Sequence, residues 1–237
     1  MLFSIGFLQI TNTYLVSIIV TILLCVSVYY INKKLSFEKP SNLQVMVEYI
    51  IDFLYSTAGE IVDDKNKLNE FFPLVATYFI YILVVNWIGL TPIFGTIGFF
   101  TKGGFIPLFK TVNSDLNSTL SMALISVISS QYFAIKHLGL LNHLKRYFSL
   151  NPINLFVGLI ELISEFTKVI SLSFRLYGNI LAGDLVIANF TSLVGFIVPL
   201  PFMGLELIVG FVQASVFAML TLAFTNILTT NMEEHGH

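Results

Sequence analysis

Long apolar segments follow one another along this chain. Residues 13–31, 71–91 and 116–135 contain no Asp, Glu, Lys or Arg. A helix needs about 20 mostly apolar residues to cross the hydrocarbon core of a bilayer, so each of these segments is predicted to be a membrane span. The pattern therefore indicates a polytopic membrane protein.

Residues 41–62 follow a different pattern, because polar side chains recur there about every four residues. This spacing places the polar groups along one face of a helix and the apolar groups along the other. We expect an amphipathic helix that lies in the membrane surface, or one that packs on a soluble neighbour within a complex. The polar positions are Gln44, Glu48, Asp52, Ser56 and Glu60. Residues 92–113 are rich in Gly, Phe and Pro and are predicted to form an outer loop.

No proline interrupts the chain between Pro152 and Pro199. One helix over this segment would be about 69 Å long at 1.5 Å per residue, against a hydrocarbon core of about 30 Å. The segment therefore either turns near residues 177–179 and forms two spans, or forms one strongly tilted helix. Five polar residues on one helical face favour the tilted helix, since a turn would not keep them in register. These residues are Glu161, Glu165, Lys168, Arg175 and Asn179.

After a turn that contains the sequence PLP at 199–201, residues 202–229 form a last apolar segment that returns inward. We therefore predict an all-α polytopic membrane protein, with residues 1–237 as a single membrane domain. It should contain about five membrane helices plus the amphipathic surface helix. The last two helices, 153–190 and 202–229, should be long, tilted and arranged as a hairpin.

Composition agrees with a membrane protein and excludes several other classes. The chain is 56% hydrophobic and 11% charged, whereas soluble domains are roughly 25% charged. Its net charge is -2, and its basic residues lie at the ends of apolar segments and form no patch. We therefore expect no nucleic-acid partner. A single cysteine, Cys25, excludes a disulfide framework and a cysteine metal site.

Basic residues set the expected orientation. Lys33, Lys34 and Lys39 follow the first span, and cytoplasmic ends of spans are enriched in Lys and Arg. The N-terminus should then face outward and the C-terminus the cytoplasm, although Lys102 and Lys110 would lie outside. A second cluster would lie on the cytoplasmic side as well, and it consists of Lys136, His137, His143, Lys145 and Arg146.

Arg175 is the most informative residue, because it lies in an apolar segment and its guanidinium stays protonated at physiological pH. Asp184 is nine residues further on, which is about 180° away on the helical wheel, so the two should not form an intrahelical ion pair. Glu206 and Gln213, seven residues apart, share one face of the last helix. Because that helix folds back, Asp184 and Glu206 should reach a similar depth near the outer surface, with Arg175 and Gln213 deeper.

Each charge at the centre of a membrane helix costs at least about 2.5 to 3.5 kcal/mol and usually marks an ion pathway or a ligand site. The structural alternative is a set of internal salt bridges. It accounts for Lys168, which could pair with Glu161 or Glu165. It accounts poorly for Arg175 and Asp184, which face away from each other.

Four motifs carry a family resemblance. Residues 175–185 read RLYGNILAGDL, and Glu206 precedes Gln213-Ala-x-x-Phe at the spacing given above. With NWIGLTP at 86–92 and NSDLNSTLSMAL at 113–124, they resemble subunit a of F-type ATP synthases. The resemblance extends over most of the chain from residue 40 onward. It implies a stator subunit with two offset aqueous half-channels beside a rotating ring of c subunits, without a catalytic site of its own.

The resemblance also assigns roles to residues. Arg175 would match the family's essential arginine, which faces the rotor carboxylates, and Asn179 and Gln213 the polar positions beside it. Asp184 and Glu206 would match the titratable pair of the outer half-channel, and Glu161 an acidic position toward the inner mouth. The set expected along the proton path is Arg175, Asn179, Asp184, Glu206, Gln213, Glu161 and Lys168.

The resemblance further implies partners and a location. The partners would be the c-ring subunits, the peripheral-stalk b subunits, the lipid bilayer and a translocated proton or sodium ion. No cofactor is expected. The location would be a bacterial plasma membrane or an organelle inner membrane, and the overall activity would be ATP synthesis coupled to ion transport.

The chain departs from the usual pattern of this family at two points. Relatives often carry one histidine and one glutamate at the outer positions, whereas Asp184 and Glu206 are both carboxylates. Two carboxylates repel each other when both are ionised, so one is expected to keep a transferable proton near neutral pH. Val169 occupies a position where relatives often have proline, which should straighten the helix locally.

Two other functional classes fit the sequence less well. A secondary ion-coupled transporter would also bury charges, but it usually contains internal repeats, and the RLYGN block has no second copy. A membrane-embedded hydrolase would need a nucleophile with a base, or a metal cluster. Neither His137 with His143 nor His235 with His237 has Cys or Asp neighbours at ligand spacing, so both pairs are expected at the solvated surface.

Overall fold

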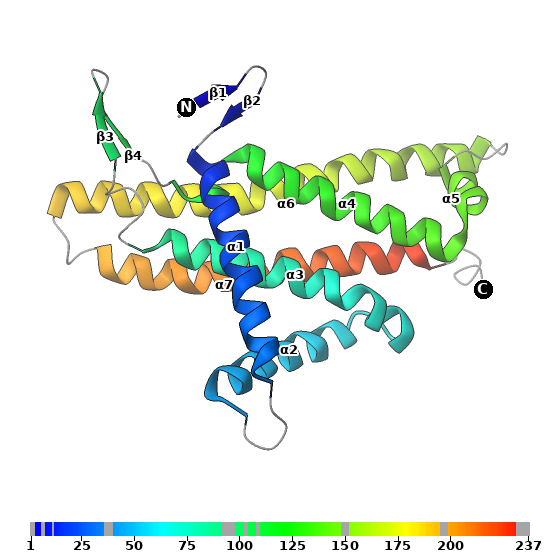
Figure 1. The fold of residues 1–237 in the computed structure, drawn as a ribbon. Helices are drawn as coiled ribbons and strands as arrows, with labels where there is room; N and C mark the ends of the chain where they lie inside the picture. The colour runs from blue at the N-terminus through cyan, green and yellow to red at the C-terminus, as the bar shows by residue number, and fades with distance from the viewer. Residues whose placement is uncertain are drawn as a thin grey trace.

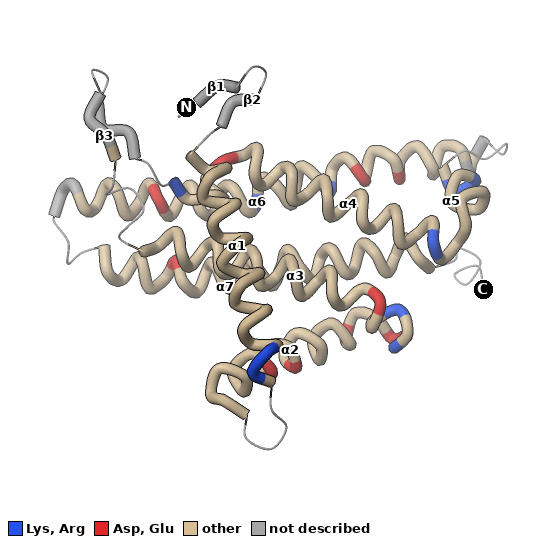
Figure 2. Tube along the Cα trace, viewed as in Figure 1, with Lys and Arg blue, Asp and Glu red and all other residues tan. Residues whose placement is uncertain are grey.

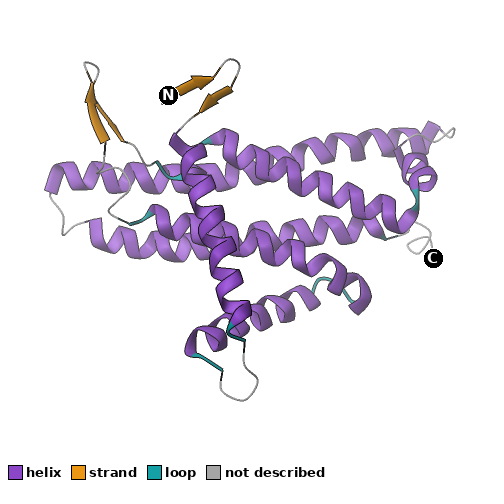
Figure 3. Cartoon of the chain, in the orientation of Figure 1, coloured by secondary structure: helices purple, strands orange, loops and turns teal. Residues whose placement is uncertain are grey.

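A computed structural model describes residues 3–5, 8–10, 12–35, 40–91, 98–101, 104–107, 110–147, 152–194 and 199–230. Within these ranges the chain is almost entirely helical, with two small antiparallel hairpins (Figures 1 and 3). The α-helices are α1 (Asn12–Lys33), α2 (Asn42–Gly59), α3 (Lys65–Gly89), α4 (Leu116–Leu138), α5 (Leu140–Tyr147), α6 (Pro152–Val194) and α7 (Pro199–Thr229). The other elements are β1 (Phe3–Ile5), β2 (Leu8–Ile10), β3 (Gly98–Thr101), β4 (Gly104–Pro107) and the 3-10 turn η1 (Val112–Ser114).

Four helices lie side by side along a common axis, and α1 crosses them steeply. Figure 1 shows α3, α4, α6 and α7 as a layered bundle, with α5 at one end and the two hairpins on the same side as the N-terminus. Helix α6 is one unbroken helix through residue 178, which confirms a single long helix and excludes a turn there. Helix α7 folds back along it.

Four of the described helices are long and apolar enough to cross a membrane, namely α1, α3, α4 and α7. Helix α6 is not among these four; it carries Glu161, Glu165, Lys168, Arg175 and Asp184 along its length. These features confirm the all-α polytopic membrane fold. The surface helix expected over residues 41–62 corresponds to α2, which packs on α3 through Leu54 and Ala58 and leaves Met46 and Tyr49 exposed.

Local signals explain where the helices begin and end. The side chains of Ser41, Asp64 and Asp115 each accept a hydrogen bond from a backbone N–H in the first turn of α2, α3 and α4, as good N-caps do. Gly139 ends α4 with a φ of 79°, which residues with a side chain rarely adopt. This turn lets α5, which the hydrophobic pattern did not predict, begin immediately after α4.

The core lies where α3 and α4 pack against α6 and α7. Its largest fully buried side chains include Phe71, Phe79, Phe217, Leu172 and Leu222. The interface between α4 and α7 is formed instead by small residues and hydroxyls. Ser126 Oγ lies 2.8 Å from Thr221 Oγ1, and Ser130 Oγ lies 2.8 Å from Thr225 Oγ1.

We call these four residues the hydroxyl ladder. Buried Ala123 and Ala134 on α4, and Ala214 and Ala218 on α7, flank it. Small residues let two membrane helices approach closely, and hydroxyls can then hydrogen-bond between them. This contact holds α7 against α4, which also packs on α6.

The outer loop predicted over residues 92–113 contains structure that the sequence pattern did not indicate. Within the described residues of this segment, β3 and β4 form a hairpin and η1 forms a turn with all three residues buried. Lys102, which we expected outside, lies outside the described residues. The turn η1 matters for the site, because it contacts both α3 and α6.

Candidate functional site

Arg175 lies on a face of α6 that the described part of the chain leaves uncovered. Its side chain is exposed, and its one hydrogen bond among the described residues is from Nη2 to Ser171 Oγ, at 3.5 Å. It forms no ion pair with any carboxylate in the described part of the chain. Phe166, Ile170 and Phe174, which precede it, are each more than half exposed. The guanidinium of Arg175 therefore projects beside an exposed apolar surface of α6.

Asn179, one turn after Arg175, contacts the facing helix. Its Nδ2 donates a 2.8 Å hydrogen bond to Gln213 Oε1 on α7. Gln213 is buried, and its Nε2 has no hydrogen-bond partner in the described part of the chain. The two residues expected beside Arg175 are thus brought together across the α6–α7 interface.

Two carboxyl groups meet further along the hairpin. Glu206 on α7 is buried, with no protein hydrogen bond to its Oε2 among the described residues. It packs directly on Gly183 of α6, where an added Cβ would collide with the carboxylate. Asp184 lies close enough to Glu206 for the two charges to interact. It also faces the hydroxyls of Thr111 and Ser114, and Lys110 lies within electrostatic range.

The pair is therefore at a common depth, as the folding back of the last helix predicts. Gly183 explains how the site accommodates it, because only a residue without a side chain leaves room for the Glu206 carboxylate. Among the described residues, neither Asp184 nor Glu206 forms an ion pair. Figure 2 shows acidic positions, in red, on α6 and α7 toward the end of the bundle where α6 ends and α7 begins.

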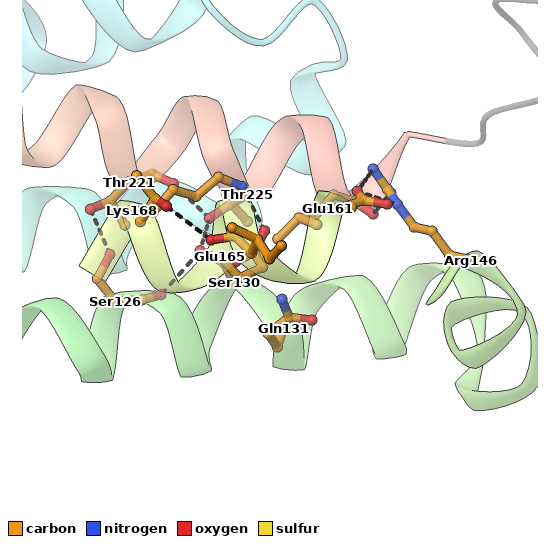
Figure 4. Close-up of polar contacts among 12 residues, drawn as sticks. Ser126, Ser130, Gln131, Arg146, Glu161, Glu165, Lys168, Thr221 and Thr225 are labelled. Atoms are coloured by element: carbon orange, nitrogen blue, oxygen red, sulfur yellow. Dashed lines mark hydrogen bonds and ion pairs between the residues drawn. The ribbon is translucent and has the colours of Figure 1, made fainter. Parts of the chain in front are cut away.

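The opposite end of α6 carries a second charged group, which we call the inner ion-pair cluster: Arg146, Glu161, Glu165 and Lys168 (Figure 4). Lys168 Nζ donates to Glu165 Oε1 at 2.6 Å and lies 4.7 Å from the centre of the Phe224 ring. Arg146 of α5 binds Glu161 Oε1 through Nε at 2.6 Å and Nη2 at 2.5 Å.

Of the two expected partners for Lys168, the structure selects Glu165. The alternative pairing of Glu161 with Lys168 was wrong, because α5 returns over α6 and brings Arg146 to Glu161. Gly158 makes this return possible, since an added Cβ there would lie 2.8 Å from the Arg146 carbonyl oxygen. Arg146 Nη1 also donates to the Leu228 carbonyl oxygen at 3.2 Å, which ties α5 to α7.

His143 was expected at the solvated surface, and this expectation was wrong. It is buried, with Nε2 2.7 Å from Gln131 Oε1 and its ring 5.2 Å from that of Tyr147. Burial lowers the pKa of His143, and the charge of Arg146 lowers it further, against the opposing effect of Glu161 and Glu165. His143 therefore lies on the side of α5 that is turned toward α4 and α6. The charge pattern of the sequence could not indicate which side of α5 is buried.

The surface position predicted for His137 is confirmed, and the other two histidines lie outside the described residues. His137 is exposed and lies 3.1 Å from Glu70 Oε2, and Lys136 binds the other oxygen of Glu70 at 2.7 Å. His235 and His237 lie outside the described residues.

Sequence reasoning missed a buried amide pair beside the outer carboxyls. Asn113 Nδ2 donates to Asn86 Oδ1 at 2.6 Å, and Asn86 Nδ2 donates to the backbone oxygen of Gly210 at 3.3 Å. Both side chains are buried. The available signal was an asparagine at the end of the apolar segment 71–91.

The geometry separates the titratable groups into two sets. One contains Asp184 and Glu206, the other contains Glu161 and Glu165, and both are on the α6–α7 hairpin. Between them lies Arg175, which cannot exchange a proton at physiological pH. Such an arrangement places carboxyl groups toward either end of the hairpin, with a permanent cation between them on α6.

Comparison with known proteins gives consistent matches. A sequence model of the family described as ATP synthase A chain matches residues 14–226. The ATP synthase subunit a of Moorella thermoacetica is 32% identical over 223 residues, covering 94% of this chain and 93% of that protein. The ATP synthase subunit a of Legionella pneumophila strain Corby is 33% identical and covers 94% and 88%. That of Gloeobacter violaceus is 32% identical and covers 98% and 89%.

Proposed function

This chain belongs to the ATP synthase A chain family, and from this premise we propose that it is the stator subunit of the membrane sector of an F-type ATP synthase. In this proposal, it forms two offset aqueous half-channels that carry protons to and from carboxylates on a ring of c subunits. Proton flow then turns the ring and drives ATP synthesis.

The exposed, unpaired guanidinium of Arg175 carries this proposal. A charge inside the membrane is costly unless it meets water or an opposite charge, and no carboxylate of the described residues supplies one. The apolar surface around it, with Phe166, Ile170 and Phe174, would pack against a hydrophobic partner. A ring of helices that carries a carboxylate at the same depth supplies both the apolar contact and the missing charge.

Arg175 would act on each rotor carboxylate as it passes. A nearby positive charge favours the ionised form of a carboxyl group, so the site loses its proton on approach. Because the guanidinium does not titrate, it provides no direct proton path between the two half-channels. Asn179 and Gln213, joined at 2.8 Å, would hold the polar environment beside it.

The two carboxyl sets would serve the two half-channels. Asp184 and Glu206 would exchange protons with the outer side. On the inner side, Glu161 binds Arg146 through Oε1 and keeps Oε2 free of any hydrogen bond from the described residues, while Lys168 holds Glu165. A proton that crosses the membrane potential releases about 2.3 kcal/mol per 100 mV, and rotation is obligatory because the half-channels do not meet.

We infer the orientation from the basic residues. Lys33 and Lys34 end α1, and Lys136, Lys145 and Arg146 lie around α5, so the N-terminus would face outward and the C-terminus the cytoplasm. Lipid and the peripheral-stalk b subunits would cover the exposed apolar side of α1. The membrane would be a bacterial plasma membrane or an organelle inner membrane.

The test is ATP-driven proton pumping in vesicles that contain the whole complex with Arg175→Ala. We expect pumping to be abolished while the complex assembles in normal amounts. Ser171→Ala, which removes the hydroxyl that Arg175 contacts, is the control and should keep most of the pumping. Undiminished pumping by Arg175→Ala would refute the proposal, and repeating the assay at several sodium concentrations identifies the coupling ion.

A further inference from the structure

The buried amide pair of Asn86 and Asn113 joins three elements at one point. Asn86 lies on α3 and is 3% exposed, and Asn113 lies on η1 and is 0% exposed. Asn113 donates to the Asn86 oxygen, which leaves the Asn86 NH₂ directed at the backbone oxygen of Gly210 on α7. The hydrogen bond from Asn113 therefore fixes which end of the Asn86 amide faces α7.

Gly210 lies between two residues of the proposed proton path. It is four residues after Glu206 and three before Gln213, so all three share one face of α7. A Cβ added to Gly210 would lie 3.1 Å from Asn86 Cβ, which means that α3 contacts the α7 backbone directly here. The next residue of α3, Trp87, donates through Nε1 to the Leu207 carbonyl oxygen at 3.2 Å.

At this point α3 holds α7 by two side-chain hydrogen bonds to the α7 backbone, one turn apart. Backbone bonds of this kind resist rotation about the helix axis, whereas apolar packing permits small rotations. The polar ends of side chains lie about 5 Å from a helix axis, so a rotation of about 20° displaces them by about 2 Å. A displacement of this size breaks a hydrogen bond.

We propose that Asn86, held by Asn113, is a positioning residue that fixes the rotation of α7. In this orientation Glu206 stays against Gly183 beside Asp184, and Gln213 stays on Asn179. Asn86 touches neither carboxyl group in the described contacts and acts through the α7 backbone. The inference rests on the proposed function, since it assigns Asn86 to the support of the same site.

Two variants test the proposal in the complete complex. Asn86→Leu keeps the approximate volume and removes the bond to Gly210, and Gly210→Ala separates α3 from α7 at the same point. We expect each to lower ATP-driven proton pumping per assembled complex on the order of ten- to hundred-fold, as small misplacements of catalytic groups do. Each should also displace the pH profile of pumping, because Glu206 and Asp184 then interact differently.

Matched controls separate positioning from general stability. Asn226 also donates its Nδ2 to a backbone oxygen, that of Ile61 at 3.1 Å, but it lies 20 residues after Glu206 on α7, about 30 Å along the helix. Gly204 is also on α7, with open space where a Cβ would be added. Asn226→Leu and Gly204→Ala should keep the wild-type pH profile and most of the pumping per complex.

Several results would overturn the proposal. These are normal pumping by Asn86→Leu or Gly210→Ala, a loss with an unchanged pH profile, and failure of both to assemble while both controls assemble. The last result would make the amide pair a structural contact only. Failure of the proposed function is a separate outcome, because it would appear as normal pumping by Arg175→Ala.

Discussion

The two charged regions of α6 use similar residues in opposite ways. In the inner ion-pair cluster, each cation binds a carboxylate at 2.5 to 2.6 Å. Seven residues after Lys168, Arg175 has no such partner among the described residues, and neither do Asp184 and Glu206. Part of the difference comes from α5, which lies at one end of α6 and brings Arg146 to Glu161 (Figures 1 and 4). Lys168 pairs with Glu165 of its own helix.

This difference separates charges that hold the fold from charges that are left for a partner. Removing one member of a buried ion pair leaves an uncompensated charge and is strongly destabilising. Removing an exposed charge without a partner changes stability little. The inner cluster should therefore respond to mutation mainly through stability, and the region around Arg175 mainly through transport.

The largest effect is expected at the outer carboxyl pair. Asp184→Asn and Glu206→Gln each remove a group proposed to exchange protons, and such groups contribute about 10²- to 10⁴-fold to rate. Proton-driven ATP synthesis by the assembled complex should fall by about that factor. Asp63→Asn, at an exposed position outside the bundle, is the control. If both single variants kept normal synthesis, the outer half-channel would not pass through this pair.

A large loss of stability is expected at Arg146. Arg146→Ala leaves Glu161 without its partner inside the bundle, which should lower the free energy of unfolding by about 3 to 5 kcal/mol. Arg175→Ala should change it by less than about 0.5 kcal/mol. Chemical unfolding of the purified chain in detergent measures both. Equal losses in the two variants would remove the distinction between the two regions.

A pH effect of intermediate size is expected from His143. Its pKa is lowered in the folded protein, from an unfolded value of about 6.5, so below that pH the unfolded chain binds more protons. Stability is then greatest above about pH 6.5 and declines as pH falls toward the folded pKa, by at most about 1.4 kcal/mol per pH unit. Unfolding of wild type and His143→Gln between pH 7.5 and 5 would show this, and identical slopes would contradict it.

The smallest effect is expected in the hydroxyl ladder. Ser126→Ala removes the bond to Thr221 and should cost about 0.6 kcal/mol, the average for such bonds between membrane helices. Ser121→Ala, on the exposed side of α4, should cost less. Thermal unfolding of the two variants in the same detergent compares them, and a larger loss for Ser121→Ala would be inconsistent with a ladder that holds α4 on α7.

Particular residues show how far the sequence could be read. The polar stripe from Glu161 to Asn179 predicted that α6 continues through Gly178, and it does. The spacing of Glu206 and Gln213 predicted a common face, and both are buried toward α6. The pairing of Glu161 and the burial of His143 could not be predicted, because both depend on Gly139 and Gly158, which let α5 fold back onto α6.

The sequence by itself determined the membrane fold, the long helices and the face of each on which polar groups lie, because these follow from hydropathy and from a fixed helical period of about 3.6 residues. Only the tertiary structure decided which charges pair, that Arg175 has no ion-pair partner within the described ranges and that Asn86 reaches α7. These contacts depend on how each helix is rotated against its neighbours, and that rotation is set by packing between segments far apart in the chain.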